Sequence, residues 1–334
     1  MLNTEFHSAI GPPDLKLFET APQLREVTIR SGSLYGRLEL PFHQLTKLSI
    51  GPEFPPEKWV EYLRLCPNLI VFEADMQAIA TNMITISQEP YLTHRCLRVL
   101  RLSGGVGVGY CPIDAVALTL PALQILDLHD DNSKYPHSHY PIGSLQPITD
   151  MVSRSGCTFT TFRWSSKGHL TPAIEQDPAI DIHLRAYPHL LNLDISLDIK
   201  WISPFLKRLT SQSPCPRLET LDIFITGELA FHEKKSRMSR YPRPPLIGLW
   251  LDSQALIIFL QARRAGSHDL RRIRISDSQF GSLKELCDHP EPPEIQTLRD
   301  EGMMIVFGSK EVSEKHVDCG MMYASGCRST GCDA

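Results

Sequence analysis

The chain has 334 residues, of which 42% are hydrophobic and 22% are charged, as in an ordinary folded protein. Its formal net charge of -4 predicts no general attraction to nucleic acid or to anionic lipid. Neither a secretory signal nor a membrane span is expected, because the N-terminus has no basic start before an apolar run and no stretch of about 18 uncharged apolar residues occurs.

A short apolar pattern recurs ten times along the chain. Each copy places apolar side chains at its first, fourth and sixth positions, as in Leu97, Leu100 and Leu102. The copies begin at Leu24, Leu45, Leu69, Leu97, Leu123, Phe159, Leu190, Leu218, Leu246 and Leu270. Most of their spacings fall near the 20–29 residues that are typical of leucine-rich repeats, which stack into a solenoid.

The pattern predicts both strands and helices. The fourth and sixth positions share one face of a short strand, because side chains alternate along a strand. Amphipathic segments between the strands predict helices over Glu57–Leu65, Ile142–Val152, Trp201–Leu209 and Gln254–Gln261. Strand, helix and strand in succession imply right-handed crossovers between parallel strands. We therefore expect an α/β leucine-rich-repeat solenoid, with a curved parallel sheet on the concave face and irregular helices on the convex face.

The expected organisation has three parts. Residues 1–20 form an N-terminal lead-in, and residues 21–310 form the repeat domain. This domain ends in a closing unit at about 276–310, with a helix over Ile295–Glu301 and a last strand over Met303–Phe307. Residues 311–334 are rich in Cys, Gly and Ser without periodicity and are predicted to be disordered.

The repeats are degenerate at their ninth position. Regular members of this class place Asn or Cys there, but this chain does not, as Gly105 and Asp198 illustrate. The side-chain ladder that closes each turn is therefore expected to be missing.

The nine cysteines form no Cys-x-x-Cys motif, and their number is odd. Four of them stand shortly before a repeat strand and are predicted to be buried free thiols, namely Cys66, Cys96, Cys157 and Cys215. Free thiols indicate a reducing compartment, so we expect a cytoplasmic or nuclear protein. No role is assigned to the cysteines of the C-terminal segment, which are Cys319, Cys327 and Cys332.

The fifth position of each copy faces away from the predicted core. In chain order these residues are Thr28, Ser49, Glu73, Arg101, Asp127, Arg163, Asp194, Asp222, Trp250 and Arg274. Neighbouring strands lie about 4.8 Å apart, so Glu73 to Asp194 would form a row of alternating charge. The row has two interpretations that remain open: self-pairing across strands, or a polar recognition stripe.

Two aromatic residues mark the most specific candidate surface. Trp250 and Phe224 would point away from the core, and aromatic side chains in such positions are typical of interface anchors. Together with Asp222, Arg272 and Arg274 they form the predicted partner-binding patch. The alternative is that a loop folds over the two aromatic residues.

Three other motifs carry no assigned chemistry. The segment His129–His139 has metal-ligand residue types but no rigid frame, so no metal is expected. Gly104–Gly109 lacks the glycine order of a dinucleotide fingerprint, so no cofactor is expected. The basic run Lys234–Arg243 is interpreted as a solvated loop, with a docking or phosphorylation site as the alternative. No nucleophile elbow or acid/base carboxylate pair occurs, and no catalytic residue is predicted.

Five phrases of the sequence are similar to a known family. They are Leu17–Leu24, Leu40–Leu48, Cys66–Leu69, Leu118–Leu123 and Leu298–Met303. With them, residues from about 14 to 310 resemble the degenerate leucine-rich-repeat region of fungal, especially basidiomycete, F-box-like proteins. The resemblance implies repeats that hold the substrate of a ubiquitin ligase, while an F-box binds the ligase adaptor. The first repeat begins at Leu24, so an adaptor is expected as a partner only if an F-box lies upstream.

The predicted function is a non-catalytic protein–protein interaction module that resembles these substrate-recognition repeats. The alternative is a free-standing leucine-rich-repeat scaffold unconnected to ubiquitin. Neither nucleic acid nor a membrane is expected as a partner.

Overall fold

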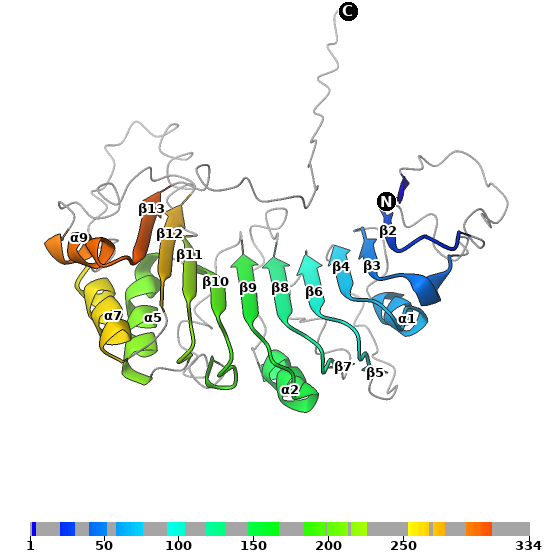
Figure 1. The fold of residues 1–334 in the computed structure, drawn as a ribbon, viewed down its shortest axis with the longest axis horizontal. Coiled ribbons are helices and arrows are strands. Elements are labelled where there is room, and N and C mark those ends of the chain that lie inside the picture. The colour runs from blue at the N-terminus through cyan, green and yellow to red at the C-terminus, as the bar shows by residue number, and fades with distance from the viewer. Residues whose placement is uncertain are drawn as a thin grey trace, which may run out of the picture.

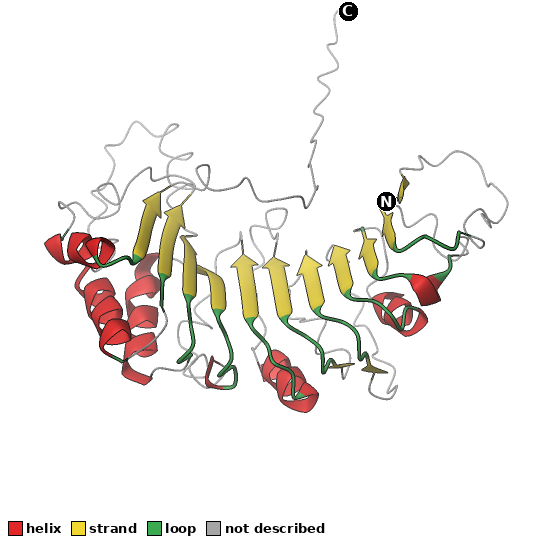
Figure 2. Cartoon of the chain, viewed as in Figure 1, coloured by secondary structure: helices red, strands yellow, loops and turns green. Residues whose placement is uncertain are grey.

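The computed structural model consists of one long parallel sheet with helices along one side of it. The structure describes residues 2–4, 21–30, 40–51, 58–75, 92–103, 118–130, 146–166, 184–197, 199–212, 215–225, 253–266, 270–277 and 292–308. Figure 1 shows the strands side by side in a shallow arc, with the helices toward its lower side. Figure 2 shows the same separation of strands and helices by type.

Eleven strands form the sheet, and each pairs in parallel with the next along the chain. They are β1 (Leu2–Thr4), β2 (Glu26–Ile29), β3 (Lys47–Ile50), β4 (Val71–Asp75), β6 (Val99–Ser103), β8 (Ile125–Asp130), β9 (Thr161–Ser166), β10 (Asn192–Leu197), β11 (Thr220–Ile225), β12 (Arg272–Asp277) and β13 (Met304–Gly308). Two short strands, β5 (Leu92–Thr93) and β7 (Leu118–Thr119), form a separate parallel pair.

The described helices are short and follow individual strands. They are the 3-10 helix η3 (Phe42–Gln44) and the α-helices α1 (Lys58–Leu65), α2 (Gln146–Ser155), α5 (Ile199–Gln212), α7 (Ser253–Ala265) and α9 (Pro293–Asp300). Helices are present in all four expected regions, although residues 142–145 of the second lie outside the described part. The closing helix and last strand correspond to α9 and β13.

Nine of the ten apolar copies contain a strand, as predicted. The copy at Leu246 lies outside the described residues. Its expected place in the sheet is nevertheless wrong, because β11 pairs directly with β12 from Thr220 opposite Arg272 to Ile225 opposite Asp277. No strand stands between these two. Apolar spacing indicates which side chains are buried, whereas strand order depends on backbone pairing that this spacing does not encode.

A tight turn precedes most strands and follows from the sequence. In five copies, the N–H of the first residue donates to the carbonyl three residues earlier, at 3.0–3.2 Å, and proline stands second in the turn. Proline suits that position because its fixed φ matches the turn. These prolines are Pro22, Pro67, Pro121, Pro188 and Pro216.

A main-chain ladder links successive copies where the side-chain ladder is missing. The carbonyl of each second-position residue accepts two N–H groups from the next copy; for example, Glu219 accepts from Arg271 at 2.9 Å and from Arg272 at 3.1 Å. The same two hydrogen bonds join each pair of neighbouring copies from the copy of β2 to the copy of β12. The same backbone atoms therefore link successive copies whatever side chains they carry.

The core runs along the whole sheet. Every described side chain at the fourth and sixth positions of a repeat copy is at most 5% exposed. Aromatic residues contribute to the core near its middle, where the rings of Phe159 and Tyr187 pack edge-on with their centroids 5.2 Å apart. Burial of each large apolar side chain contributes about 1.5–3 kcal/mol, and neighbouring copies share that burial.

One buried cation stands out between α5 and α7. Arg263 is 1% exposed and donates to the carbonyl of Cys215 at 2.8 Å and to that of Leu209 at 3.3 Å. Its guanidinium also lies 5.5 Å from the ring centre of Phe259. Burial lowers the pKa of Arg263. Its positive charge near the C-terminal end of α5 complements the helix dipole.

The four cysteines that stand shortly before a repeat strand are free, but burial differs among them. Cys66 and Cys215 are fully buried, Cys157 is half-buried and Cys96 is exposed, so the prediction for Cys96 is wrong. The buried position lies three residues before a copy begins, where Cys66 and Cys215 stand. In the copy at Leu97 that position belongs to His94.

In the turn before Leu97, a side-chain nitrogen of His94 replaces the backbone carbonyl as the hydrogen-bond acceptor. Its Nδ1 accepts the N–H of Leu97 at 3.1 Å, so its Nε2 carries the proton and donates to the carbonyl of Cys66 at 2.9 Å. The side chain is 3% exposed. His94 is therefore a structural histidine that joins two repeat copies.

Candidate functional site on the polar face of the sheet

The strands carry polar side chains on the face opposite the core, here called the polar face. The register places the described fifth-position residues in a single row across this face. In order, the row reads Thr28, Ser49, Glu73, Arg101, Asp127, Arg163, Asp194, Asp222 and Arg274. The predicted order is confirmed up to Asp222, and Arg274 follows Asp222 directly. Trp250 does not stand between them; it lies outside the described residues.

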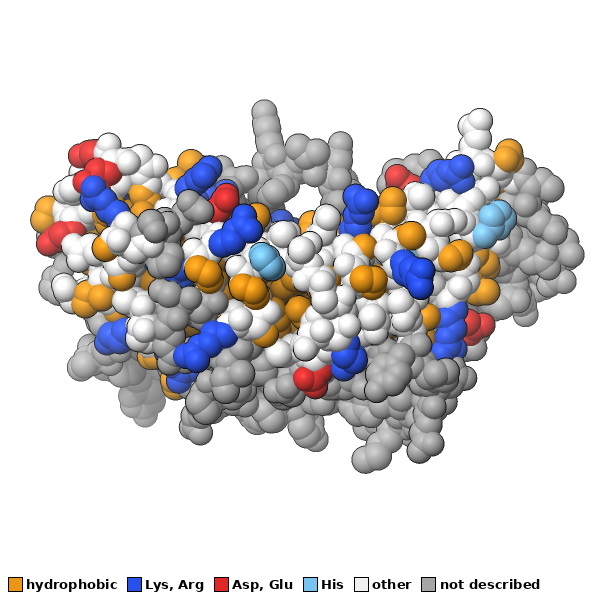
Figure 3. All heavy atoms as spheres, turned by 60° about the horizontal axis from the view of Figure 1, so that its bottom comes forward, with side chains coloured by type: hydrophobic (Ala, Val, Ile, Leu, Met, Phe, Trp, Pro, Cys, Tyr) orange, Lys and Arg blue, Asp and Glu red, His pale blue; other side chains and the backbone are white. Residues whose placement is uncertain are grey.

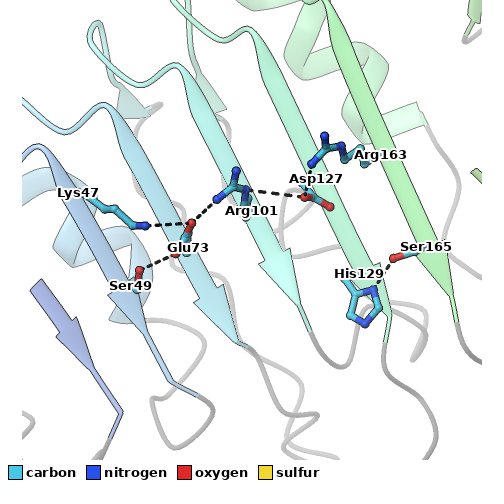
Figure 4. Close-up of polar contacts among 8 residues, drawn as sticks. All are labelled: Lys47, Ser49, Glu73, Arg101, Asp127, His129, Arg163 and Ser165. Atoms are coloured by element: carbon cyan, nitrogen blue, oxygen red, sulfur yellow. Dashed lines mark hydrogen bonds and ion pairs between the residues drawn. The ribbon is translucent and has the colours of Figure 1, made fainter. Parts of the chain in front are cut away.

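The first charged part of the row centres on Glu73. Its carboxylate accepts a hydrogen bond from Ser49 at 2.7 Å, lies 3.6 Å from Lys47 and forms an ion pair with Arg101 (Figure 4). Burial alone would raise the pKa of Glu73. The Ser49 hydrogen bond and the two cations outweigh that effect, so the pKa lies below its ordinary value.

Asp127 continues the same network. Arg101 and Arg163 each lie 3.8 Å from one of its oxygens, on the strands to either side (Figure 4). Burial nevertheless raises the pKa of Asp127, against the opposing effect of the two arginines. On the same strand, His129 forms a hydrogen bond with Ser165. Self-pairing therefore accounts for the charges from Lys47 to Arg163.

The second charged part centres on Asp222. One carboxylate oxygen, Oδ2, accepts hydrogen bonds from Arg274 at 2.7 Å and from Arg272 at 3.2 Å. The other oxygen, Oδ1, is buried and has no hydrogen-bond partner in the described part of the chain. The carboxylate is thus held on one side by two arginines of a single neighbouring strand.

Asp194 breaks the alternation of charge. It stands directly opposite Asp222 in the register, and within the described ranges no side chain forms a hydrogen bond or ion pair with it. Burial and the Asp222 carboxylate raise the pKa of Asp194 to about 6, against the weaker effects of Arg163 and Arg274. Two like charges opposite each other destabilise a sheet.

The polar face becomes apolar at β13. Met304 is 56% exposed and Val306 is 39% exposed, and they stand opposite Arg272 and Arg274 in the register. Ile305 between them faces the core at 5% exposure. Exposed apolar side chains that adjoin charged groups are typical of interaction surfaces.

The structure brings together four of the five residues of the predicted partner-binding patch. Phe224, Asp222, Arg272 and Arg274 lie on the adjacent strands β11 and β12, and Phe224 is half-buried. The remaining predicted residues stand further along the same row; they are Asp194, Arg163, Asp127, Arg101 and Glu73. Met304 and Val306 were missed, although their alternation with Ile305 in the expected last strand was a usable signal.

Three further features of the described part of the chain concern metal ligands, apolar helices and basic side chains. It contains no group of three or more His, Cys, Asp or Glu side chains placed to hold a metal ion. None of its helices combines the length and apolar character that a membrane crossing requires. On the face that Figure 3 shows, its Lys and Arg side chains are scattered rather than gathered into one stripe.

A comparison with models of protein families finds none that matches this chain, and no curated protein sequence matches it either.

Proposed function

We propose that this chain is a non-catalytic leucine-rich-repeat module that holds a protein partner on its polar face. The observation that carries this proposal is the exposed apolar pair Met304 and Val306, which adjoins charged side chains in the C-terminal part of the sheet. Interfaces combine apolar contact with oriented charges in this way. The polar face would be the concave face of the solenoid, with the helices on the convex side.

The repeat architecture supports the proposal. Parallel strands follow one another in chain order, and the same main-chain bonds recur at successive junctions. Arrays of this kind present long, continuous surfaces that suit macromolecular partners.

The similarity to F-box-like repeats suggests a specific role, the recognition of a substrate for a ubiquitin ligase. A free-standing scaffold would use the same face without the ligase. Co-purification of the full-length native protein with the ligase adaptor and its cullin would favour the first role. Partners that are captured without either of those proteins would favour the scaffold.

Affinity capture with matched surface variants tests the proposed binding face. Met304→Ser combined with Val306→Ser removes the apolar pair from the polar face. Ile258→Ser on α7 is the control, because Ile258 is exposed to a similar extent, 44%. We expect partners that the wild type and the control retain to be lost from the double variant. Equal retention by all three proteins would contradict binding at this face.

A further inference from the structure

We propose that the polar face from β10 to β13 binds an extended segment of a protein partner that carries a basic side chain for Asp194 and an apolar side chain for Met304 and Val306. This inference rests on the proposed function and specifies the chemistry of the partner.

The first step of the argument is the charge balance of the row. It contains four carboxylates, and three of them have an arginine or lysine nitrogen within 4 Å: Glu73, Asp127 and Asp222. Asp194 has no such neighbour among the described side chains, although it stands on the same face. A partner cation would supply the charge that this position lacks.

The second step excludes a metal ion at this position. Arg272 and Arg274 already occupy the neighbouring carboxylate of Asp222, which leaves Asp194 as a single carboxylate for a divalent cation. Such a cation would also need several oxygen ligands. A single guanidinium or ammonium group of a peptide can pair with one half-buried carboxylate such as Asp194.

The third step concerns the apolar end of the surface. Asp194, Asp222, Arg274 and Val306 follow one another in the register of four adjacent strands. Three strand intervals of about 4.8 Å separate Asp194 from Val306 by about 14 Å. An extended chain covers that distance in about four residues, at 3.4 Å per residue. Asp222 between them already binds Arg272 and Arg274, so it needs no cation from the partner.

Binding should also depend on pH. Asp194 faces Asp127 on β8, Arg163 on β9, Asp222 on β11 and Arg274 on β12. Burial and the carboxylate of Asp222 raise its pKa to about 6, so Asp194 loses its charge as the pH falls through that value. Attraction for a basic side chain is therefore expected to weaken in the same range.

Fluorescence polarisation with synthetic peptides tests the inference on the full-length chain. The probes are short labelled peptides of Gly, Ser and Thr that carry one Arg and one Leu, with the separation increased one residue at a time. We expect the tightest binding when Arg and Leu are about four residues apart. Asp194→Asn should weaken that peptide about tenfold, and it should leave a peptide with citrulline in place of Arg unaffected.

Glu61→Gln is the matched control, because Glu61 is exposed on the helix α1, away from β10 to β13. This variant should bind the peptides like the wild type. Failure of every peptide to bind, indifference to the Arg–Leu separation, or equal binding by Asp194→Asn would overturn the inference. Preferred binding of an acidic peptide or of an oligonucleotide would overturn it as well.

The outcomes separate the inference from the proposed function. Partner capture that depends on Met304 and Val306 but not on Asp194 would support a protein-binding face and contradict the basic segment. Capture that depends on neither would contradict both.

Discussion

Asp194 and Asp222 stand directly opposite each other on β10 and β11, and both point away from the core. Arg272 and Arg274 both bind Asp222. The chain therefore folds with a charge conflict in the middle of a regular sheet. Such conflicts are common where a surface serves a partner rather than the fold, and their energetic effect can be measured.

Asp194→Asn is expected to stabilise the fold at neutral and higher pH. Burial and the Asp222 carboxylate raise the pKa of Asp194 from 3.8 to about 6, so the folded state binds a proton more tightly than the unfolded state. The stability that this proton gives the wild type is fully present below pH 3.8 and is lost as the pH rises through about 6. Well above that range, Asn should increase the free energy of unfolding by about 1–3 kcal/mol.

Urea denaturation of wild type and variant across this range measures the effect. The difference between the two proteins should shrink as Asp194 becomes protonated in the wild type. A variant that is less stable than the wild type at neutral pH would show that the Asp194 carboxylate does not destabilise the fold.

Glu73→Gln should show the opposite dependence on pH. The pKa of Glu73 lies below its ordinary value of 4.5, because Ser49, Lys47 and Arg101 outweigh the effect of burial. Its contribution is present above pH 4.5 and is lost as the pH falls through the lowered pKa. We expect a loss of about 1–3 kcal/mol in the free energy of unfolding at neutral pH and convergence with the wild type in acid. A constant difference at all pH values would exclude an electrostatic cause.

Leu221→Asp should abolish cooperative unfolding. Leu221 is fully buried on β11, and a carboxylate in that position would lose its hydration without gaining a partner. The milder Leu221→Ala is expected to cost about 2–5 kcal/mol. Thermal melting followed by circular dichroism measures both, with Ile258→Asp as the exposed control. An unchanged melting curve for Leu221→Asp would refute a core shared between neighbouring copies.

Arg263→Leu should destabilise the packing of α5 against α7. The substitution leaves the carbonyls of Leu209 and Cys215 without their buried donor, which predicts a loss of about 2–4 kcal/mol. Arg264→Leu is the control one residue away, since Arg264 is 56% exposed on its side chain and pairs with Glu301 at the surface. Its effect should stay within about 1 kcal/mol. Equal losses for the two variants in urea denaturation would contradict a specific role for the buried cation.

Thiol labelling should distinguish the cysteines by their positions in the repeat. Burial raises the pKa of Cys66 and of Cys215 to about 12, and the reactive thiolate is therefore scarce at both. Cys96 is exposed. With a maleimide reagent and peptide mass spectrometry, Cys96 is expected to react before Cys66 and Cys215 in the native protein, and the two buried thiols only on unfolding. Labelling of Cys66 as fast as Cys96 would show that its repeat opens readily.

The strands were predictable because the pattern reports burial directly. Leu100 and Leu102 alternate with Arg101 in the sequence, and alternation of this kind determines which side chains share a face of a strand. Since neighbouring copies repeat it in phase, the row from Glu73 to Asp222 could also be placed in register. The alternating charges of its first half left self-pairing and a recognition stripe as open interpretations, and the ion pairs of the structure show the self-pairing.

The surroundings of Asp222 were not predictable from the same pattern. The Leu246 copy suggested a strand that would have separated Asp222 from Arg274. Direct pairing of β11 and β12 instead brings the two into contact at 2.7 Å. Strand order depends on hydrogen bonds between main chains. The three apolar positions of the Leu246 copy do not determine these bonds. The burial of His94 and the exposure of Cys96 likewise depend on turn geometry rather than on residue type.

The junctions between copies also bear on how such a chain can evolve. Glu219 accepts the two N–H groups of the next copy even though residues 226–271 separate their strands. These bonds use atoms that every non-proline residue possesses, so they impose almost no restriction on the side chains around them. Mutation can therefore revise the outward positions one at a time, and insertions can accumulate between strands, without disturbing alignment. Lineages that inherit this framework could change its outer surface while retaining its shape.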